Sequence, residues 1–227
     1  VKKLTDYGID IGQGRVYTES VKEEDWANNW KQYYKPTRIG DNIVIKPEWE
    51  DYEAGENDLV IRMDPGMAFG TGSHETTSMC IANLEKYVDK DSTVFDIGCG
   101  SGILGIVAAK LGAKDVVGID IDAVAVKVAK ENISKNGVDK VMVAMEGNLA
   151  DDMDKDKKAD IVVANIIADI IVILAKDVKS FLKEGGIFIS SGIILAKIDE
   201  VVASLEENGF ELVSVEKKGE WACVIAR

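Results

Sequence analysis

The sequence predicts an α/β fold, a doubly wound and mostly parallel sheet with helices on both faces. From residue 92 onward, short apolar runs alternate with amphipathic stretches, which is typical of strands joined by helices of roughly 10–15 residues. A glycine-rich turn from Gly98 to Gly102 follows the first of these runs and opens a helix. The chain ends on two strand-like runs in succession within residues 211–227, so the last two strands are expected to form an antiparallel hairpin.

The apolar runs give the strands of this sheet, and the stretches between them give the helices. Strands are expected at residues 93–98, 115–120, 141–145, 159–166 and 185–192, with two more in 211–227. Helices are expected at residues 102–112, 122–137, 168–183 and 195–209. Gly112 and Gly137 are expected to close the first two helices, and Asp122 to be the N-cap of the second. The charged stretch 151–160 is expected to be a solvated loop.

The first third of the chain has a different pattern. Residues 15–21 alternate as a strand does, and residues 23–34 place aromatic side chains on one face of a helix that ends before Pro36. Such an aromatic stripe favours packing over ligand binding. Residues 42–49 and 58–64 are expected to be two short strands joined by the polar turn 50–57.

Charge and cysteine content limit the possible partners. The chain of 227 residues has 27 Lys and Arg against 40 Asp and Glu, a net charge of −13. This balance disfavours direct nucleic-acid binding, which needs cationic surface. It suits a cationic ligand or a basic protein partner, although acidity alone more often serves only solubility. Cys80, Cys99 and Cys223 lack metal-ligand spacing and are expected to be reduced thiols, with no metal, in a cytoplasmic protein. No run is apolar enough to span a membrane, and no signal peptide opens the chain.

The turn after the first strand is a candidate cofactor site. Gly98, Gly100 and Gly102 allow close approach of the backbone to a ligand, and the helix that follows offers unpaired N–H groups. The second strand ends at Asp120, 22 residues beyond Gly98. An acidic side chain at this place accepts hydrogen bonds from the two hydroxyls of a ribose. A purely structural role as N-cap is less suitable for Asp120, because Asp122 already fills that position.

The spacing of the glycines distinguishes between cofactors. A dinucleotide fingerprint requires a third glycine where this chain has Ile103. Gly98, Gly100 and Gly102 instead have the spacing of S-adenosylmethionine-dependent methyltransferases. The fourth strand ends at Asn165, whose side-chain oxygen is expected to orient an attacking amine beside the cofactor. The alternative that Asn165 is only a strand-ending turn residue stays open at this point.

Five stretches together resemble a known family. They are "EEDWANNWKQYYKP", "MDPGMAFGTGSHETT", "VFDIGCGSGILGI", "VGIDID" and "IVVANI". The chain is similar over nearly its whole length to the bacterial methyltransferases that modify the stalk-base protein of the large ribosomal subunit, ribosomal protein eleven. The resemblance implies a seven-stranded class I core that binds S-adenosyl-L-methionine through Thr77, Gly98, Asp120 and Asn165. It also implies that the methyl acceptors are lysine ε-amines and an N-terminal α-amine of that ribosomal protein.

The resemblance also implies a domain organisation. Residues 1–20 are expected to be the remnant of an N-terminal recognition domain, residues 21–36 a linker helix and residues 37–227 the catalytic domain. The chain starts at Val1 and not at Met, and most of the recognition domain is expected to be missing from it. We therefore expect cofactor binding to be retained and modification of the protein substrate to need a longer chain.

The two glycine-rich loops are expected to enclose the cofactor from two sides. Gly98 and Gly100 would hold the ribose and methionine end, while Phe69 would cover the methionyl group as part of a lid with glycine hinges. His74 is the one candidate base by residue type, but nothing in the sequence aligns it with a catalytic partner, so a loop-structuring or cofactor-adjacent position is favoured. Other readings are a class I methyltransferase acting on RNA or a small molecule, and a non-catalytic module that binds a nucleotide cofactor.

Overall fold

The computed structural model describes residues 34–64, 72, 74–148 and 156–227. The chain divides into two compact units, Val1–Lys35 and Pro36–Arg227, and only the second is described below. The expected recognition-domain remnant, the strand at 15–21, all but the end of the linker helix, and Phe69 lie outside the described residues. None of the described helices is long and apolar enough to cross a membrane.

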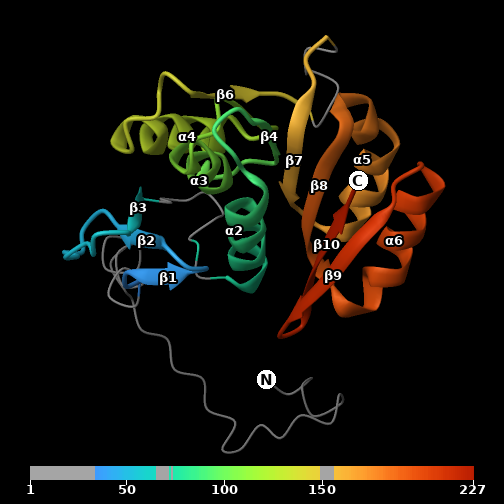
Figure 1. Ribbon diagram of the computed structural model, residues 1–227, viewed down its shortest axis with the longest axis horizontal. Coiled ribbons are helices and arrows are strands. Elements are labelled where there is room, and N and C mark those ends of the chain that lie inside the picture. The colour runs from blue at the N-terminus through green and yellow to red at the C-terminus, as the bar shows by residue number, and fades with distance from the viewer. Residues whose placement is uncertain (1–33, 65–71, 73, 149–155) are drawn as a thin grey trace, which may run out of the picture. The chain divides into compact units, whose positions relative to one another are not determined.

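The core of the second unit is the doubly wound sheet that the sequence predicts (Figure 1). Its seven strands run in the order β6-β5-β4-β7-β8-β10-β9. Their bounds are β4 Thr93–Ile97, β5 Asp115–Asp120, β6 Met142–Glu146, β7 Ala159–Asn165, β8 Leu182–Ile194, β9 Leu212–Lys218 and β10 Trp221–Ala226. All neighbours from β6 to β8 are parallel, whereas β10 is antiparallel to both β8 and β9. The predicted fold class and the antiparallel C-terminal hairpin are confirmed.

Helices cover both faces of this sheet. They are α2 Glu75–Tyr87, α3 Ile103–Leu111, α4 Ala123–Lys135, α5 Ala168–Val178 and α6 Ile198–Glu207. Alternate residues of a strand point to opposite faces, and β4 shows which helices lie on which face. Phe95 belongs to the apolar cluster that contains the buried side chains of α5 and α6, whereas the side chain of Asp96 accepts a hydrogen bond from Gly105 N in α3. The caps also agree with the sequence, since Asp122 caps α4 and Gly112 closes α3.

A second sheet of three strands precedes the core. Its strands are β1 Thr37–Ile39, β2 Ile43–Pro47 and β3 Leu59–Met63, in that order. The strands expected at 42–49 and 58–64 are present, but β2 and β3 are parallel, so the connection between them is a crossover and not the expected turn. Asp58 fixes this connection, because its carboxylate accepts hydrogen bonds from Gly55 N, Tyr52 Oη and Arg38. These three bonds lower the pKa of Asp58 to about 2, the bond from Tyr52 being the largest cause.

Helix α2 is an element that the sequence analysis does not anticipate. It follows directly on the first glycine-rich loop, and its buried side chains include Met79, Cys80, Ile81 and Leu84. The run "SMCIANLEKY" is short of charge and could have been assigned to a helix on this basis. The omission matters because the first turn of α2 places Thr77 at the site described next.

Candidate cofactor and acceptor site

A cavity of about 700 Å³ opens at the carboxyl ends of β4, β5 and β7. This is the edge at which open α/β sheets bind their ligands. The residues of the sequence prediction that line it are Thr77, Gly98, Gly100, Asp120 and Asn165. The structure therefore brings together every predicted site residue that it describes. Phe69 is the one predicted site residue outside the described part of the chain.

The glycine-rich turn forms the floor of this cavity beside β4 and β5. The backbone N–H groups of Gly98 and Cys99 both donate to Ile119 O, at 2.8 and 2.9 Å, which attaches the turn to the neighbouring strand. Gly98 has a φ of +72°, and a Cβ built there would lie 2.5 Å from Ile166 Cγ2. A side chain at position 98 would thus be strained and would fill the space between β4 and the loop after β7.

Asp120 stands at the end of β5 and closes the glycine-rich turn from the other side. Its Oδ2 accepts a hydrogen bond from Gly100 N at 2.7 Å, and its Oδ1 accepts one from Asp122 N at 3.0 Å. A carboxylate has about four lone-pair positions, so each oxygen can accept a further hydrogen bond from a ligand hydroxyl. Asp122 caps α4 through Val124 N at 2.8 Å, which leaves Asp120 for the cavity, as expected.

Asn165 ends β7 and contacts the first turn of α2. Its Nδ2 donates to Thr77 Oγ1 at 3.1 Å, while its Oδ1 is buried and has no hydrogen-bond partner among the described residues. An unpaired buried carbonyl oxygen is unfavourable unless a donor fills the site. The nitrogen of the amide is thus bound to Thr77, and its oxygen is an unpaired, buried acceptor of a residue that lines the cavity.

His74 and Trp221 form the wall of the cavity on the α2 side. The His74 side chain is the N-cap of α2, since Nδ1 accepts a hydrogen bond from Thr76 N at 3.3 Å, and its ring meets that of Trp221 edge-on with centroids 5.1 Å apart. Nδ1 also lies 2.8 Å from Thr76 Oγ1, and Nε2 lies 3.9 Å from a Glu75 oxygen. His74 therefore holds the start of α2 next to the site.

Sequence reasoning missed several residues that line the cavity. They include Ile121, Gly147, Asn148, Ile167, Gly192 and Trp221. Ile121 and Ile167 are large apolar side chains that remain 71% and 64% exposed. Each of the two directly follows a predicted strand. An isoleucine just beyond the carboxyl end of a strand was therefore the signal in the sequence that could have indicated them. Trp221 had no local signal, because only the antiparallel pairing of β10 with β8 brings it to this edge.

Asp96 is a buried carboxyl group behind the glycine-rich turn. Burial raises its pKa to about 7, and the negative charge of Asp120 adds to this effect, while the hydrogen bond from Gly105 N opposes it. The three cysteines are buried and free, as expected. Among the described residues no group of His, Cys, Asp and Glu side chains could hold a metal ion.

Comparison with known proteins agrees with this geometry. A family model described as ribosomal protein L11 methyltransferase (PrmA) matches residues 1–227. The chain belongs to this family. The ribosomal protein L11 methyltransferase of Alkaliphilus oremlandii is 60% identical over all of this chain and 72% of its own length. That of Clostridium botulinum is 59% identical with the same coverage.

Solved structures confirm the class I methyltransferase fold. The ribosomal protein L11 methylase of Lactobacillus delbrueckii subsp. bulgaricus is 36% identical and superposes with a TM-score of 0.80, over 86% of this chain and 98% of that one. A precorrin-6y C5,15-methyltransferase of Geobacter metallireducens, at 17% identity, has a TM-score of 0.60 over 74% of this chain and 97% of that one, which shows the fold alone. The resemblance expected from the sequence motifs is thereby confirmed for the L11 methyltransferase family.

Proposed function

We propose that this chain transfers a methyl group from S-adenosyl-L-methionine to amino groups of ribosomal protein L11, namely lysine side chains and the N-terminal amine. The observation that supports it best is the pair of oriented acceptors in one cavity. Asp120 stands beside the glycine-rich turn, and Asn165 has its side-chain nitrogen bound to Thr77 and its oxygen unpaired. The first suits ribose hydroxyls and the second suits an amine.

The described residues fit the cofactor in three respects. The cavity of about 700 Å³ has the volume of sites for ligands of this size. Asp120 would accept hydrogen bonds from the ribose hydroxyls, and the backbone at Gly98 and Gly100, which lines the cavity, would lie against the ligand. Ile121, which is 71% exposed at the mouth of the cavity, gives a flat base an apolar surface to cover. The cofactor supplies an electrophilic methyl group on a sulfonium, and the protein supplies the position of the acceptor.

The acceptor amine must lose a proton before it can attack. For a lysine of ordinary pKa 10.4, neutralisation near pH 7.4 costs about 4 kcal/mol. A largely apolar cavity lowers the pKa of an entering ammonium by desolvation, as does the positive charge of the sulfonium. Asn165 Oδ1 would then accept an N–H of the amine and align its lone pair with the methyl group, whose bond to sulfur breaks as the bond to nitrogen forms. Holding both groups at attack distance can lower the activation free energy by several kcal/mol. No covalent enzyme intermediate is needed.

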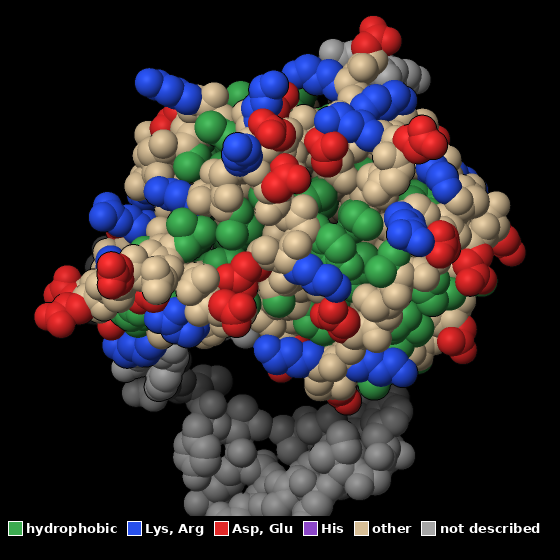
Figure 2. All heavy atoms as spheres, in the orientation of Figure 1, with side chains coloured by type: hydrophobic (Ala, Val, Ile, Leu, Met, Phe, Trp, Pro, Cys, Tyr) green, Lys and Arg blue, Asp and Glu red, His purple; other side chains and the backbone are tan. Residues whose placement is uncertain are grey.

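The charge of the chain supports a protein substrate with basic groups over RNA. The net charge is −13, and on the face shown in Figure 2 the Lys and Arg side chains are interspersed with Asp and Glu. A nucleic-acid surface needs clustered cations to displace counterions. Because ribosomal protein L11 is the substrate named for the relatives, a cytoplasmic location is part of the same proposal.

A methyl-transfer assay tests the proposal. Isolated ribosomal protein L11 is incubated with labelled S-adenosylmethionine and this chain, and in parallel with the chain extended to the length of its relatives. We expect label on lysine and the N-terminal amine with the longer chain, and little with residues 1–227, since residues 1–20 are proposed to be only part of the recognition domain. Label on RNA, or none on L11 with the longer chain, would contradict the proposal.

Ligand-dependent stability separates the cofactor from the alternatives. A ligand at 100 times its dissociation constant stabilises the folded chain by about 2.7 kcal/mol. We expect S-adenosylmethionine, and not NAD, to raise the melting temperature of residues 1–227. Stabilisation by NAD alone would favour a dehydrogenase-like nucleotide binder.

A further inference from the structure

The last turn of helix α4 and its C-cap residue carry two buried side-chain amides four residues apart. Asn132 is fully buried and Asn136 is 6% exposed. Buried amides require hydrogen-bond partners, and each of the two makes three hydrogen bonds through its side chain. The two amides have different partners. Those of Asn136 lie away from the cavity, whereas those of Asn132 include the glycine-rich turn.

Asn136 attaches α4 to the small sheet. Its Oδ1 accepts from Arg62 N at 2.9 Å, and its Nδ2 donates to Arg62 O at 2.7 Å and to Asn132 O at 2.8 Å. The amide thus pairs with β3 as a neighbouring strand would. All of its partners lie away from the cavity.

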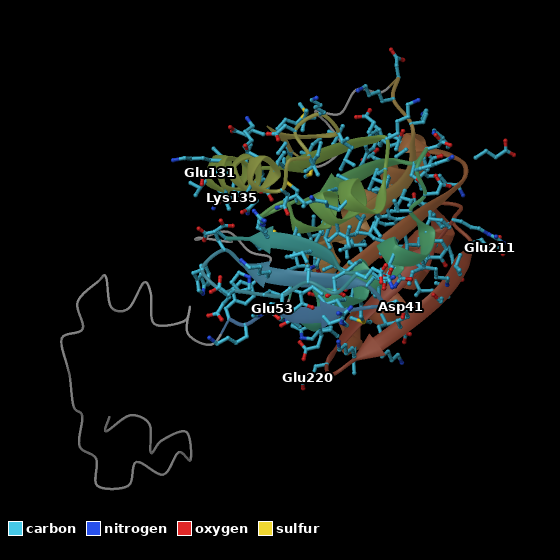
Figure 3. All side chains as sticks on the ribbon, turned by 60° about the vertical axis from the view of Figure 1, so that its left-hand side comes forward. Asp41, Glu53, Glu131, Lys135, Glu211 and Glu220 are labelled. Carbon is cyan, nitrogen blue, oxygen red and sulfur yellow. The ribbon has the colours of Figure 1, made fainter. Side chains whose placement is uncertain are left out.

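Asn132 makes the same kind of contact one turn earlier, but it also reaches the glycine-rich turn. Its Oδ1 accepts from Asp64 N at 3.1 Å, and its Nδ2 donates to Asp64 O at 3.2 Å and to Ser101 O at 3.0 Å. Ser101 is fully buried and follows Gly100, whose N–H is bound by Asp120. Asp64 ends the segment that enters the first glycine-rich loop, and Lys135, at the end of α4 (Figure 3), lies 3.4 Å from its carboxylate.

We propose that Asn132 is a positioning residue for the cofactor site. Its one amide holds two backbone segments at a fixed separation. The first is Asp64, which follows β3 just before the first glycine-rich loop, and the second is Ser101 in the glycine-rich turn after β4. Asn132 does not line the cavity, so it acts through Ser101 and Asp64. The inference rests on the proposed function, because it assigns the turn at Gly100 to the cofactor.

The expected consequence of losing Asn132 is a change in affinity without a change in chemistry. Without the amide, the turn takes its binding-competent position in only a fraction of the molecules, and the apparent dissociation constant rises by the inverse of that fraction. Saturating cofactor restores the position, because the ligand binds only the competent arrangement. A loss confined to KM for the cofactor, with kcat retained, is therefore the signature of this role.

The test compares Asn132→Ala with its matched control Asn136→Ala. Both substitutions remove a buried amide, one from the last turn of α4 and one from its C-cap, together with three side-chain hydrogen bonds each, so both are expected to lower the melting temperature by similar amounts. Calorimetry should show S-adenosylmethionine binding weakened about tenfold or more by Asn132→Ala and less than twofold by Asn136→Ala. In the longer chain, kcat at saturating cofactor should stay within about twofold for both variants.

Equal effects of the two variants on cofactor affinity, or an unchanged affinity for Asn132→Ala, would overturn the inference. If Asn132→Ala does not fold, hydrogen exchange in the unmutated chain decides. Cofactor should then increase the protection of the amide hydrogen of Asp64, which is bound by Asn132, and leave that of Arg62, which is bound by Asn136, unchanged. Unchanged protection at Asp64 overturns the inference. Failure of the unmutated chain to bind S-adenosylmethionine at all would overturn the proposed function itself.

Discussion

The side chain of Asn165 donates from Nδ2 to Thr77 Oγ1 over 3.1 Å, which joins the end of β7 to the first turn of α2. Thr77 is fully buried, so this hydroxyl is held in place by its surroundings. The bond decides which end of the amide is free, and it leaves Oδ1 without a partner among the described residues. The family resemblance implies that Thr77 contacts the cofactor. Its hydrogen bond to Asn165 indicates a second role, which is to orient the Asn165 amide.

Thr77→Val should lower turnover more than it lowers cofactor affinity. Valine has the shape of threonine without the hydroxyl, so the amide of Asn165 loses its fixed partner and can rotate. Misplacement of an acceptor guide costs on the order of ten- to a hundredfold in kcat. Steady-state kinetics of the longer chain measure it, and Thr77→Ser, which keeps a hydroxyl, should recover most of the rate. A variant with normal kcat and weak cofactor binding would assign Thr77 to the cofactor alone.

Asn165→Ala should retain cofactor binding and lose most of its turnover. The substitution removes the only side-chain oxygen that we assign to the acceptor amine, while Asp120 and the glycine-rich turn stay in place. Calorimetry with S-adenosylmethionine and a labelled-methyl assay in the longer chain separate the two effects. Equal loss of both would mean that Asn165 holds the cofactor and does not guide the acceptor.

Asp120→Ala should abolish measurable cofactor binding. Each hydrogen bond to a charged acceptor is worth about 1.5–3 kcal/mol, so the loss of two weakens binding about a hundredfold or more. Asp122→Ala is the matched control, because it lies two residues away and removes the cap contact to Val124 N. That change should cost about 1 kcal/mol of stability and leave affinity nearly unchanged. Near-native affinity of Asp120→Ala in calorimetry would refute the ribose assignment.

The sequence predicts the sheet and much of the cavity because both follow from local signals. Asp120 and Asn165 each come at the end of an apolar strand, and parallel strands bring their carboxyl ends to one edge. The glycine spacing before Ile103 then points to the ligand class. These inferences need only the periodicity of the apolar residues and the right-handedness of the connections between parallel strands. Neither depends on contacts between residues distant in the sequence.

The features that the sequence did not predict depend on distant contacts. β3 pairs with β2 in parallel and is attached on its other side to the end of α4 by the bonds of Asn136 to Arg62, whereas the polar stretch between the two strands indicates only a turn. Trp221 reaches the cavity through the pairing of β10 between β8 and β9. Asn132 is one asparagine within an amphipathic helix, and nothing in its neighbourhood indicates that its partners are Asp64 and Ser101.

Gly192→Ala should destabilise the chain and disturb the acceptor side of the cavity. Gly192 has a φ of +84°, and an added Cβ would lie 2.3 Å from Ile166 O, directly beyond Asn165. The left-handed conformation alone costs about 1–2 kcal/mol, and the collision with backbone adds to it. Gly185→Ala isolates the first contribution, because Gly185 has a φ of +73° and no atom within 4 Å of the added Cβ.

Urea denaturation of the two glycine variants measures the difference. We expect Gly192→Ala to lose more stability than Gly185→Ala, and only Gly192→Ala to lower kcat in the longer chain, since Ile166 must move and is attached to Ser191 O. Equal losses of stability with normal turnover would show that the loop after β7 yields without displacing Asn165.

The pH dependence of stability should report the buried carboxyl group of Asp96. Its pKa is raised from 3.8 to about 7, chiefly by burial, and its Oδ1 has no partner among the described residues. Between about pH 4 and pH 7 the folded chain therefore keeps a proton that the unfolded chain has released. The stability from this group is fully present below about pH 4 and is lost as the pH rises toward 7, on the order of 1 kcal/mol per pH unit.

Asp96→Asn removes this titration while keeping an acceptor for Gly105 N. The free energy of unfolding of the variant, relative to that of the unmutated chain, should therefore increase from pH 5 to pH 7 and stay constant above about pH 7. Urea titrations at intervals across this range measure the difference directly. If the two stability curves run parallel from pH 5 to pH 8, Asp96 is ionised throughout in the folded chain, and the desolvation of its carboxylate must be offset by a donor that reaches Oδ1.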